Sequence, residues 1–173
     1  MFEDDIRITG KHAIHVKYLA KDINIFDRYI DVYMVGSIFG FLYGKKAEKD
    51  TSSEDYANIL ASTVVSERLR LDFLYRLIML LDETSEHTPE GRINRAFRET
   101  ATDRDSVSLA ENMKLFNSYV LGGIEFLYEE FTDGCETRDA CIKKIYNVVT
   151  DFYNDLHIES LDIQIHEDMS SDN

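Results

Sequence analysis

The chain has 173 residues, of which 44% are hydrophobic and 30% are charged, and its formal net charge at pH 7 is −14. Ten Phe and ten Tyr residues supply enough material for a hydrophobic core, which excludes an intrinsically disordered chain. The negative net charge argues against direct binding to DNA by this chain alone, because a DNA-binding surface must neutralise phosphates with Lys and Arg. We expect a single domain over residues 1–166 and a flexible acidic tail over 167–173.

The ends of the chain and its cysteines predict a cytoplasmic protein. The first residues are acidic and lack the basic start and apolar run of a signal peptide. The longest apolar stretch, 32–43, would rise ~18 Å as a helix, which is short of the ~30 Å core of a bilayer. We therefore expect no membrane contact. Cys135 and Cys141 are expected to be free thiols, with a bridge between them as the alternative.

The scarcity of helix breakers predicts a mostly α-helical bundle of about six or seven helices, since there is one proline and there are eight glycines. Residues 6–9 alternate like a strand. Residues 11–21 fit a strand or a short helix, and we favour the helix. Asn24 is expected to cap a helix that extends over 25–44.

Two further helices are predicted in the middle of the chain. The first begins near Ser52 and continues through Leu60. The second covers 67–82 and either continues the first or follows a break at 63–66. Because this second helix is apolar on nearly every side, we expect it to be central and covered by its neighbours.

The remaining elements follow Thr88, which is expected to cap a short helix beginning at Pro89 and ending near Glu99. Apolar periodicity then predicts a helix over 107–131 and, after Thr137, a last long helix. Residues 161–166 alternate and read as a strand. This strand could pair with residues 6–9, so that the N- and C-terminal segments form a small two-stranded ribbon.

Charge is unevenly distributed, and it suggests the residues that would bind a partner. Residues 1–104 carry a net charge of −3, whereas residues 105–173 carry −11. The short helix after Pro89 places an arginine at every third position, and such a row of guanidinium groups suits phosphate or carboxylate. Ile93, Ala96 and Phe97 are expected on its opposite, buried side. The predicted partner-binding residues are Arg92, Arg95, Arg98, Asp151, Asp155 and Glu159.

Each of these charges also has a purely structural interpretation. The acidic third can be a solubilising face, because net charge keeps proteins apart. The arginines can pair within the molecule, with Glu90, Glu99 or the acidic carboxy-terminal third.

Four glycines within predicted helices suggest a close approach of two backbones. A glycine inside a helix costs ~1 kcal/mol relative to Ala, so something must offset that cost. Gly36, Gly40, Gly122 and Gly123 are therefore predicted to serve helix packing or a subunit interface, and a ligand against the backbone is the alternative. We expect the two helices to cross with Gly40 near Gly122–Gly123.

Motifs for catalysis or metal binding are weak. There is no P-loop, no dinucleotide-binding glycine pattern and no zinc-protease motif in the sequence. His12 and His15 lie three apart without a carboxylate at ligand spacing. The pairs Asp27/Asp31 and Asp151/Asp155 can arise by chance among 33 acids. We predict no catalytic residue, no metal and no cofactor, and we expect Asp31 to pair with Arg68 or Arg76.

These observations favour a non-catalytic interaction protein, a small acidic accessory subunit or adaptor of a larger assembly. Its expected partner is a protein, which could be basic or nucleic-acid-associated, and a homo-oligomer is left open. The first alternative is a subunit of a nucleic-acid-processing complex, or a nucleic-acid mimic, that acts through the acidic third and the arginine row. The second is a metal-dependent enzyme of unrecognised type.

Overall fold

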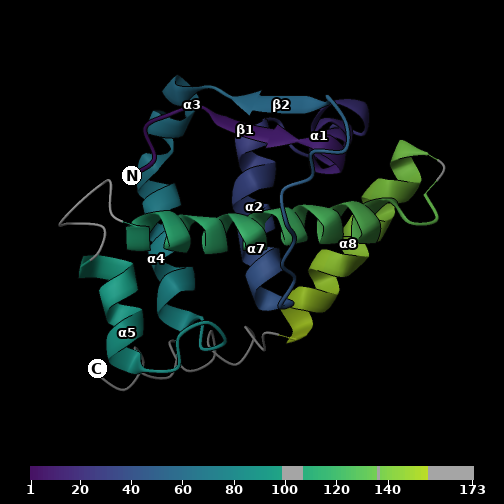
Figure 1. Ribbon diagram of the computed structural model, residues 1–173. Coiled ribbons are helices and arrows are strands. Elements are labelled where there is room, and N and C mark those ends of the chain that lie inside the picture. The colour runs from purple at the N-terminus through teal and green to yellow at the C-terminus, as the bar shows by residue number, and fades with distance from the viewer. Residues whose placement is uncertain (99–106, 136, 156–173) are drawn as a thin grey trace, which may run out of the picture. The chain divides into compact units, whose positions relative to one another are not determined.

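The computed structural model describes residues 1–98, 107–135 and 137–155. The fold is mostly α-helical with one two-stranded antiparallel sheet, which confirms the predicted fold class (Figure 1). The chain divides into two compact units, Met1–Glu129 and the residues from Glu130 onward. None of the described helices combines the length and apolar character needed to cross a bilayer. The elements are β1 (Ile6–Thr9), α1 (Gly10–Lys17), η1 (Tyr18–Asp22), α2 (Tyr29–Leu42), β2 (Tyr56–Ile59), α3 (Ala61–Ser66), α4 (Arg68–Leu81), α5 (Pro89–Ile93), η2 (Asn94–Arg98), α7 (Val107–Thr132) and α8 (Arg138–Asp155).

The sheet corrects one prediction, because the second strand is Tyr56–Ile59 and the helix predicted through Leu60 is wrong. β1 and β2 pair antiparallel, with Ile6 opposite Ile59. The physical reason is a period of two: Ala57 and Ile59 are buried, and Tyr56 and Asn58 are exposed. The strand predicted over 161–166, and hence its pairing with β1, lies outside the described residues.

Helix α1 follows β1 without a connecting loop, so this segment begins as the helix that we favoured and not as a strand. Gly10 makes the turn with a φ of 63°, in the left-handed region that favours glycine. The carboxylate of Asp50 accepts a hydrogen bond of 2.6 Å from the backbone N–H of Lys11 and so serves the first turn of α1. Asn24 does not cap α2: its φ is 51°, whereas an N-cap residue is extended, and α2 begins at Tyr29 after Arg28.

Helices α3 and α4 are separated at Glu67, so the break rather than one continuous helix is observed. Glu67 accepts a hydrogen bond of 2.7 Å from Arg28, which also binds Asp31 at 2.7 Å. Asp31 therefore pairs with Arg28, three residues away, and not with Arg68 or Arg76 as predicted.

Four aromatic rings join the N-terminal segment to three helices at the centre of the first unit. Phe116 of α7 meets Phe2, Tyr33 of α2 and Tyr75 of α4 with ring centroids 5.7–6.2 Å apart. These rings are at most 3% exposed. Helix α7 accordingly runs across both α2 and α4 (Figure 1). Edge-to-face contacts of this kind stabilise a core beyond the burial of area alone.

The second unit contains α8, which begins after Thr137 as predicted. The Thr137 hydroxyl accepts a hydrogen bond of 3.3 Å from the N–H of Ala140. Both cysteines are free thiols. Burial, followed by the hydrogen bond with Cys135, raises the pKa of the Cys141 thiol, so Cys141 is a poor nucleophile.

Candidate functional site

The predicted glycines lie at the crossing of α2 and α7. A Cβ atom added at Gly40 would overlap the backbone carbonyl of Tyr119, and one added at Gly123 would overlap the carbonyl of Gly36. Gly36 is less crowded, because its Cβ would lie 3.1 Å from the carbonyl oxygen of Val120. The structure thus brings Gly36, Gly40 and Gly123 together in a contact between two helix backbones.

Gly122 has a different neighbour, the segment that follows α2. A Cβ atom at Gly122 would overlap the carbonyl of Lys45. One turn away, the N–H of Ala47 donates to the carbonyl of Ser118 at 2.9 Å. The glycine and the hydrogen bond therefore fix the segment 45–49 along α7.

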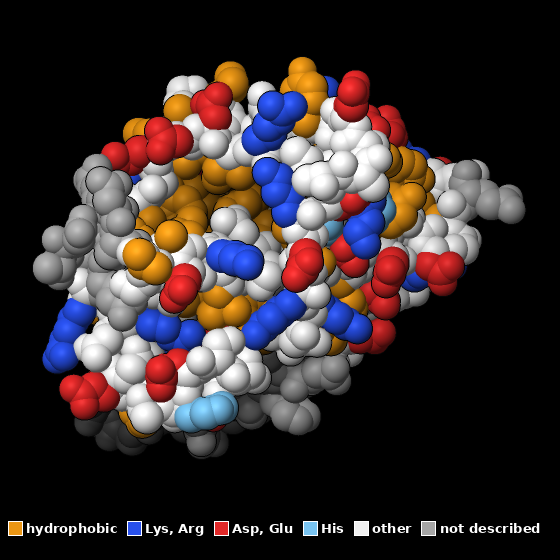
Figure 2. Space-filling model, viewed as in Figure 1, with side chains coloured by type: hydrophobic (Ala, Val, Ile, Leu, Met, Phe, Trp, Pro, Cys, Tyr) orange, Lys and Arg blue, Asp and Glu red, His pale blue; other side chains and the backbone are white. Residues whose placement is uncertain are grey.

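A pocket of about 990 Å³ opens between this segment, α7 and β1. In the space-filling view it is a hollow with apolar side chains at its floor and charged groups along its border (Figure 2). Ile8, Val64 and Tyr33 contribute buried side chains to its lining. The volume is typical of sites that bind a small molecule or a peptide segment.

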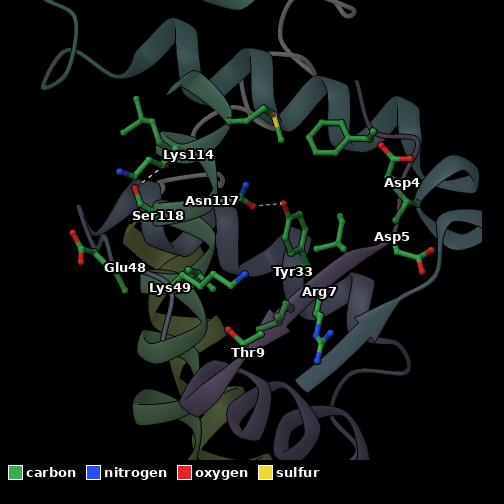
Figure 3. A pocket seen from close by; sticks show the side chains of 18 of the residues that line it. Asp4, Asp5, Arg7, Thr9, Tyr33, Glu48, Lys49, Lys114, Asn117 and Ser118 are labelled. Atoms are coloured by element: carbon green, nitrogen blue, oxygen red, sulfur yellow. Dashed lines mark hydrogen bonds between the residues drawn. The ribbon is translucent and has the colours of Figure 1, made fainter. Parts of the chain in front are cut away.

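Polar groups in the pocket come from α2 and α7. The Tyr33 hydroxyl donates a hydrogen bond of 2.7 Å to Oδ1 of Asn117, as Figure 3 shows. Burial raises the pKa of Tyr33, so its hydroxyl stays protonated and acts as a donor. This pair fixes the amide of Asn117 at the wall of the pocket.

The predicted arginine row does not form one exposed ridge. Arg95 is buried, and its Nη2 donates to the backbone carbonyls of Met79 at 3.2 Å and Asp82 at 3.0 Å. Its Nη1 also lies 3.8 Å from the Asp82 carboxylate. Arg95 therefore satisfies carbonyls at the C-terminal end of α4, as a cation at such an end should.

The two neighbouring arginines differ in exposure. Arg92 is mostly buried and pairs with Glu83 at 3.0 Å, while it also donates to the carbonyl of His87. Arg98 is exposed and donates to Oδ1 of Asn94 at 2.8 Å. Of the three, Arg98 is the one whose position suits contact with a partner.

The apolar side predicted for this helix is also different. Ala96 is buried as expected, but Ile93 is 43% exposed and Phe97 is 47% exposed. The guanidinium of Arg76 lies over the ring of Phe97, 5.7 Å from its centroid. The expectation that Ile93 and Phe97 form a buried side is therefore wrong, and Phe97 lies beside the outer face of α4.

The outer face of α4 is exposed, which corrects the expectation that neighbours cover this helix on every side. Leu69 is 86% exposed and Phe73 is 63% exposed. Leu77 and Leu81 continue the row at the same spacing of four residues and are also exposed. We call Leu69, Phe73, Leu77 and Leu81 the α4 face.

The acidic residues predicted to bind a partner lie at the end of the chain. Asp151 is exposed on α8, and Asp155 is the last residue of that helix. Glu159 lies outside the described residues.

A buried histidine and a carboxylate meet between α1 and α7. Nε2 of His12 lies 2.7 Å from Oε1 of Glu125, which also pairs with Lys11 at 2.9 Å. His15 stacks on Tyr128 with ring centroids 3.9 Å apart. No group of three His, Cys, Asp or Glu side chains in the described part of the chain is placed to hold a metal ion. The His12–Glu125 pair joins α1 to α7.

Sequence reasoning missed the α4 face and the pocket for different reasons. The spacing of Leu69, Phe73, Leu77 and Leu81 is visible in the sequence, but apolar residues on the other sides of α4 hid it. The pocket is assembled from segments far apart in the chain and has no local signal. Comparison with protein-family models, curated proteins and solved structures found no match in any of the three.

Proposed function

We propose that the chain is a non-catalytic interaction protein, an accessory subunit that docks a partner protein through the α4 face. The single observation that supports this proposal is the exposure of four large apolar side chains in one row, Leu69, Phe73, Leu77 and Leu81. Contiguous exposed apolar patches mark interaction sites on soluble proteins. Complete burial of each such side chain would contribute about 1.5–3 kcal/mol to docking.

The border of the α4 face indicates the chemistry of the partner. Arg70 and Arg76 are exposed on α4, and Arg98, which follows Phe97 in the chain, is also exposed. Arg70 already pairs with Glu67 at 3.1 Å, whereas Arg76 contacts an aromatic ring. A partner helix with an apolar face bordered by Asp or Glu would complement these cations.

The experiment compares two matched aspartate variants of the whole chain. Phe73→Asp places a charge in the centre of the α4 face, and Tyr146→Asp places the same charge at an exposed aromatic residue of α8. The wild-type chain and both variants are used to purify partner proteins from the native host. Each captured partner is then purified, and its affinity for the three forms of this chain is measured by calorimetry. We expect Phe73→Asp to weaken binding at least about tenfold and Tyr146→Asp to bind as the wild type does.

Two outcomes contradict the proposal in this form. If Phe73→Asp and Leu69→Asp bind the purified partner as tightly as the wild-type chain, the α4 face is not the docking surface. Light scattering provides the second measurement. A wild-type dimer that Phe73→Asp converts into a monomer would show that a second copy of this chain, and not another protein, covers the face.

A further inference from the structure

One edge of the two-stranded sheet has backbone groups that β2 does not use. The N–H of Gly10 donates to the carbonyl of Asp55 at 2.9 Å. In an antiparallel pair, every second pair of opposite residues exchanges hydrogen bonds. The pairs that do so here are therefore Ile8 with Ala57 and Ile6 with Ile59. The N–H and C=O of Arg7 therefore point away from β2. Within the described ranges, no third strand pairs with β1.

The pocket lies on this open edge. Figure 3 shows Tyr33, Asn117 and Lys114 on the side of β1 opposite β2. The pocket thus has β1 as one wall and α7 as another, and residues of both line it. At the far end of β1 the Thr9 hydroxyl donates to the carbonyl of Asp50 at 2.6 Å, so the chain itself lies beside β1 there.

The charges at the two ends of the pocket differ. Lys49 and Lys114 lie at one end, which Glu48 shares, and Asp4 and Asp5 lie at the other, as Figure 3 shows. The Oδ1 atom of Asp5 already accepts a hydrogen bond of 2.6 Å from the N–H of Ala61, and the neighbouring Asp4 is exposed. An occupant with an acidic group at one end and a basic group at the other would complement both ends.

We propose that this pocket binds an extended peptide segment of a partner protein, which adds to β1 as a third strand. The unused backbone groups of Arg7 would form the ladder, since strand addition gains affinity from main-chain hydrogen bonds. Alternate apolar side chains of the peptide would contact the floor at Ile8 and Val64. A small molecule without a peptide backbone would leave the edge of β1 unpaired.

The test uses the full chain and a phage-displayed library of short random peptides. The selected peptides are synthesised, and their affinities are measured by fluorescence anisotropy. We expect peptides with alternating apolar residues, and we expect N-methylation of the residues that face β1 to weaken binding about tenfold or more, because it removes ladder donors. N-methylation of the alternate residues should have little effect.

Amide hydrogen exchange followed by NMR locates the bound peptide. The Arg7 amide should become protected when the peptide is bound, whereas the Ile8 amide, already in the ladder with β2, should change little. The double variant Lys49→Glu/Lys114→Glu should weaken binding of a peptide that has an acidic group at one end. Lys143→Glu, which makes one such charge reversal at an exposed position of α8, is the control. The α4 variant Phe73→Asp should bind the peptide normally, which separates this proposal from the docking of a helix on α4.

Three outcomes would overturn the proposal. The first is a library from which no peptide binds at the pocket. The second is binding that leaves the Arg7 amide unprotected or is indifferent to N-methylation. The third is a measurement in which a synthetic peptide with the sequence of residues 158–168 binds the pocket and no other peptide does. The ligand would then be a segment of this chain and not of a partner protein.

Discussion

The imidazole of His12 donates a hydrogen bond of 2.7 Å from Nε2 to Oε1 of Glu125, which lies 113 positions away in the sequence. His12 is completely buried, and its other ring nitrogen, Nδ1, has no hydrogen-bond partner among the residues that the structure describes. Protonation would therefore place a proton on Nδ1 without an acceptor from that part of the chain. The pair holds α1 against α7 in the form with a neutral imidazole and a charged carboxylate.

This geometry predicts that acid destabilises the protein below pH 6.5. Burial lowers the pKa of His12 from its ordinary 6.5, although the hydrogen bond with Glu125 acts in the opposite direction. The unfolded chain then binds more protons than the folded one, so the free energy of unfolding falls as the pH falls through 6.5. His12→Gln should reduce this slope in urea titrations at several pH values. Burial also lowers the pKa of His15, so part of the slope should remain.

The exposed His87 supplies the control for this experiment. It lies in the loop before α5, where its Nδ1 is 2.7 Å from the Glu83 carbonyl oxygen. His87→Gln should leave the pH profile unchanged. A His12→Gln profile that coincides with the wild-type profile would contradict the proposed origin of the slope.

A second prediction concerns the crossing of α2 and α7. Gly40→Ala should destabilise the fold by about 3 kcal/mol, because the added methyl group meets the rigid backbone of Tyr119 and not a movable side chain. Gly36→Ala is the matched comparison: its added carbon lies 3.1 Å from the Val120 carbonyl oxygen, and the gain in helix propensity offsets the crowding to within about 1 kcal/mol. Chemical denaturation of both variants measures the difference. Equal stabilities would mean that the helices separate readily at this point.

A third prediction separates the structural arginine from the exposed one. Arg95→Met should destabilise the protein by about 3 kcal/mol, because the Asp82 carboxylate and the last carbonyls of α4 lose a buried cation. Arg98→Met changes an exposed side chain and should shift stability by less than about 0.5 kcal/mol. Thermal unfolding of the two variants checks both values. A stable Arg95→Met protein would show that the end of α4 does not need this cation.

A fourth prediction concerns strong acid. Backbone hydrogen bonds from Lys11 and Ser52 lower the pKa of Asp50 from 3.8 to about 2. The stability that this carboxylate provides is therefore complete above pH 3.8 and is lost as the pH falls from 3.8 towards 2. Asp50→Asn should flatten the acid limb of the stability profile over this range. Asp27→Asn, which makes the same change at an exposed position, should leave the limb as in the wild type.

Local chemistry predicted several helix starts but not every element. Thr88 and Pro89 begin α5 as expected. The Thr88 hydroxyl accepts a hydrogen bond from the backbone N–H of Gly91, and Pro89 has no backbone N–H that would be left unpaired in the first turn. The strand Tyr56–Ile59 was missed because four residues give a weak period of two, and the serines and acids before it resemble the start of a helix.

The arginine row shows why a helical period alone failed at the candidate site. The spacing of Arg92, Arg95 and Arg98 assumes a continuous α-helix, but residues Asn94–Arg98 form a π-helical turn, η2. A π-turn holds more residues than an α-turn, so every later side chain is rotated relative to the α-helical expectation. Arg95 is consequently buried and Phe97 exposed. Glycines at the crossing were easier to predict, because a glycine inside a helix has a cost that only a close neighbour offsets.

The hydrogen bond between Tyr33 and Asn117 joins residues 84 positions apart, and it has a consequence for synthesis on the ribosome. Helix α2, in which Asp31 is the one charged residue, cannot bury its glycine-lined side until α7 has been made. An apolar helix is thus left without its partner while the intervening chain is translated. Nascent chains halted before α7 should therefore recruit chaperones, and those extended through Phe131 should release them.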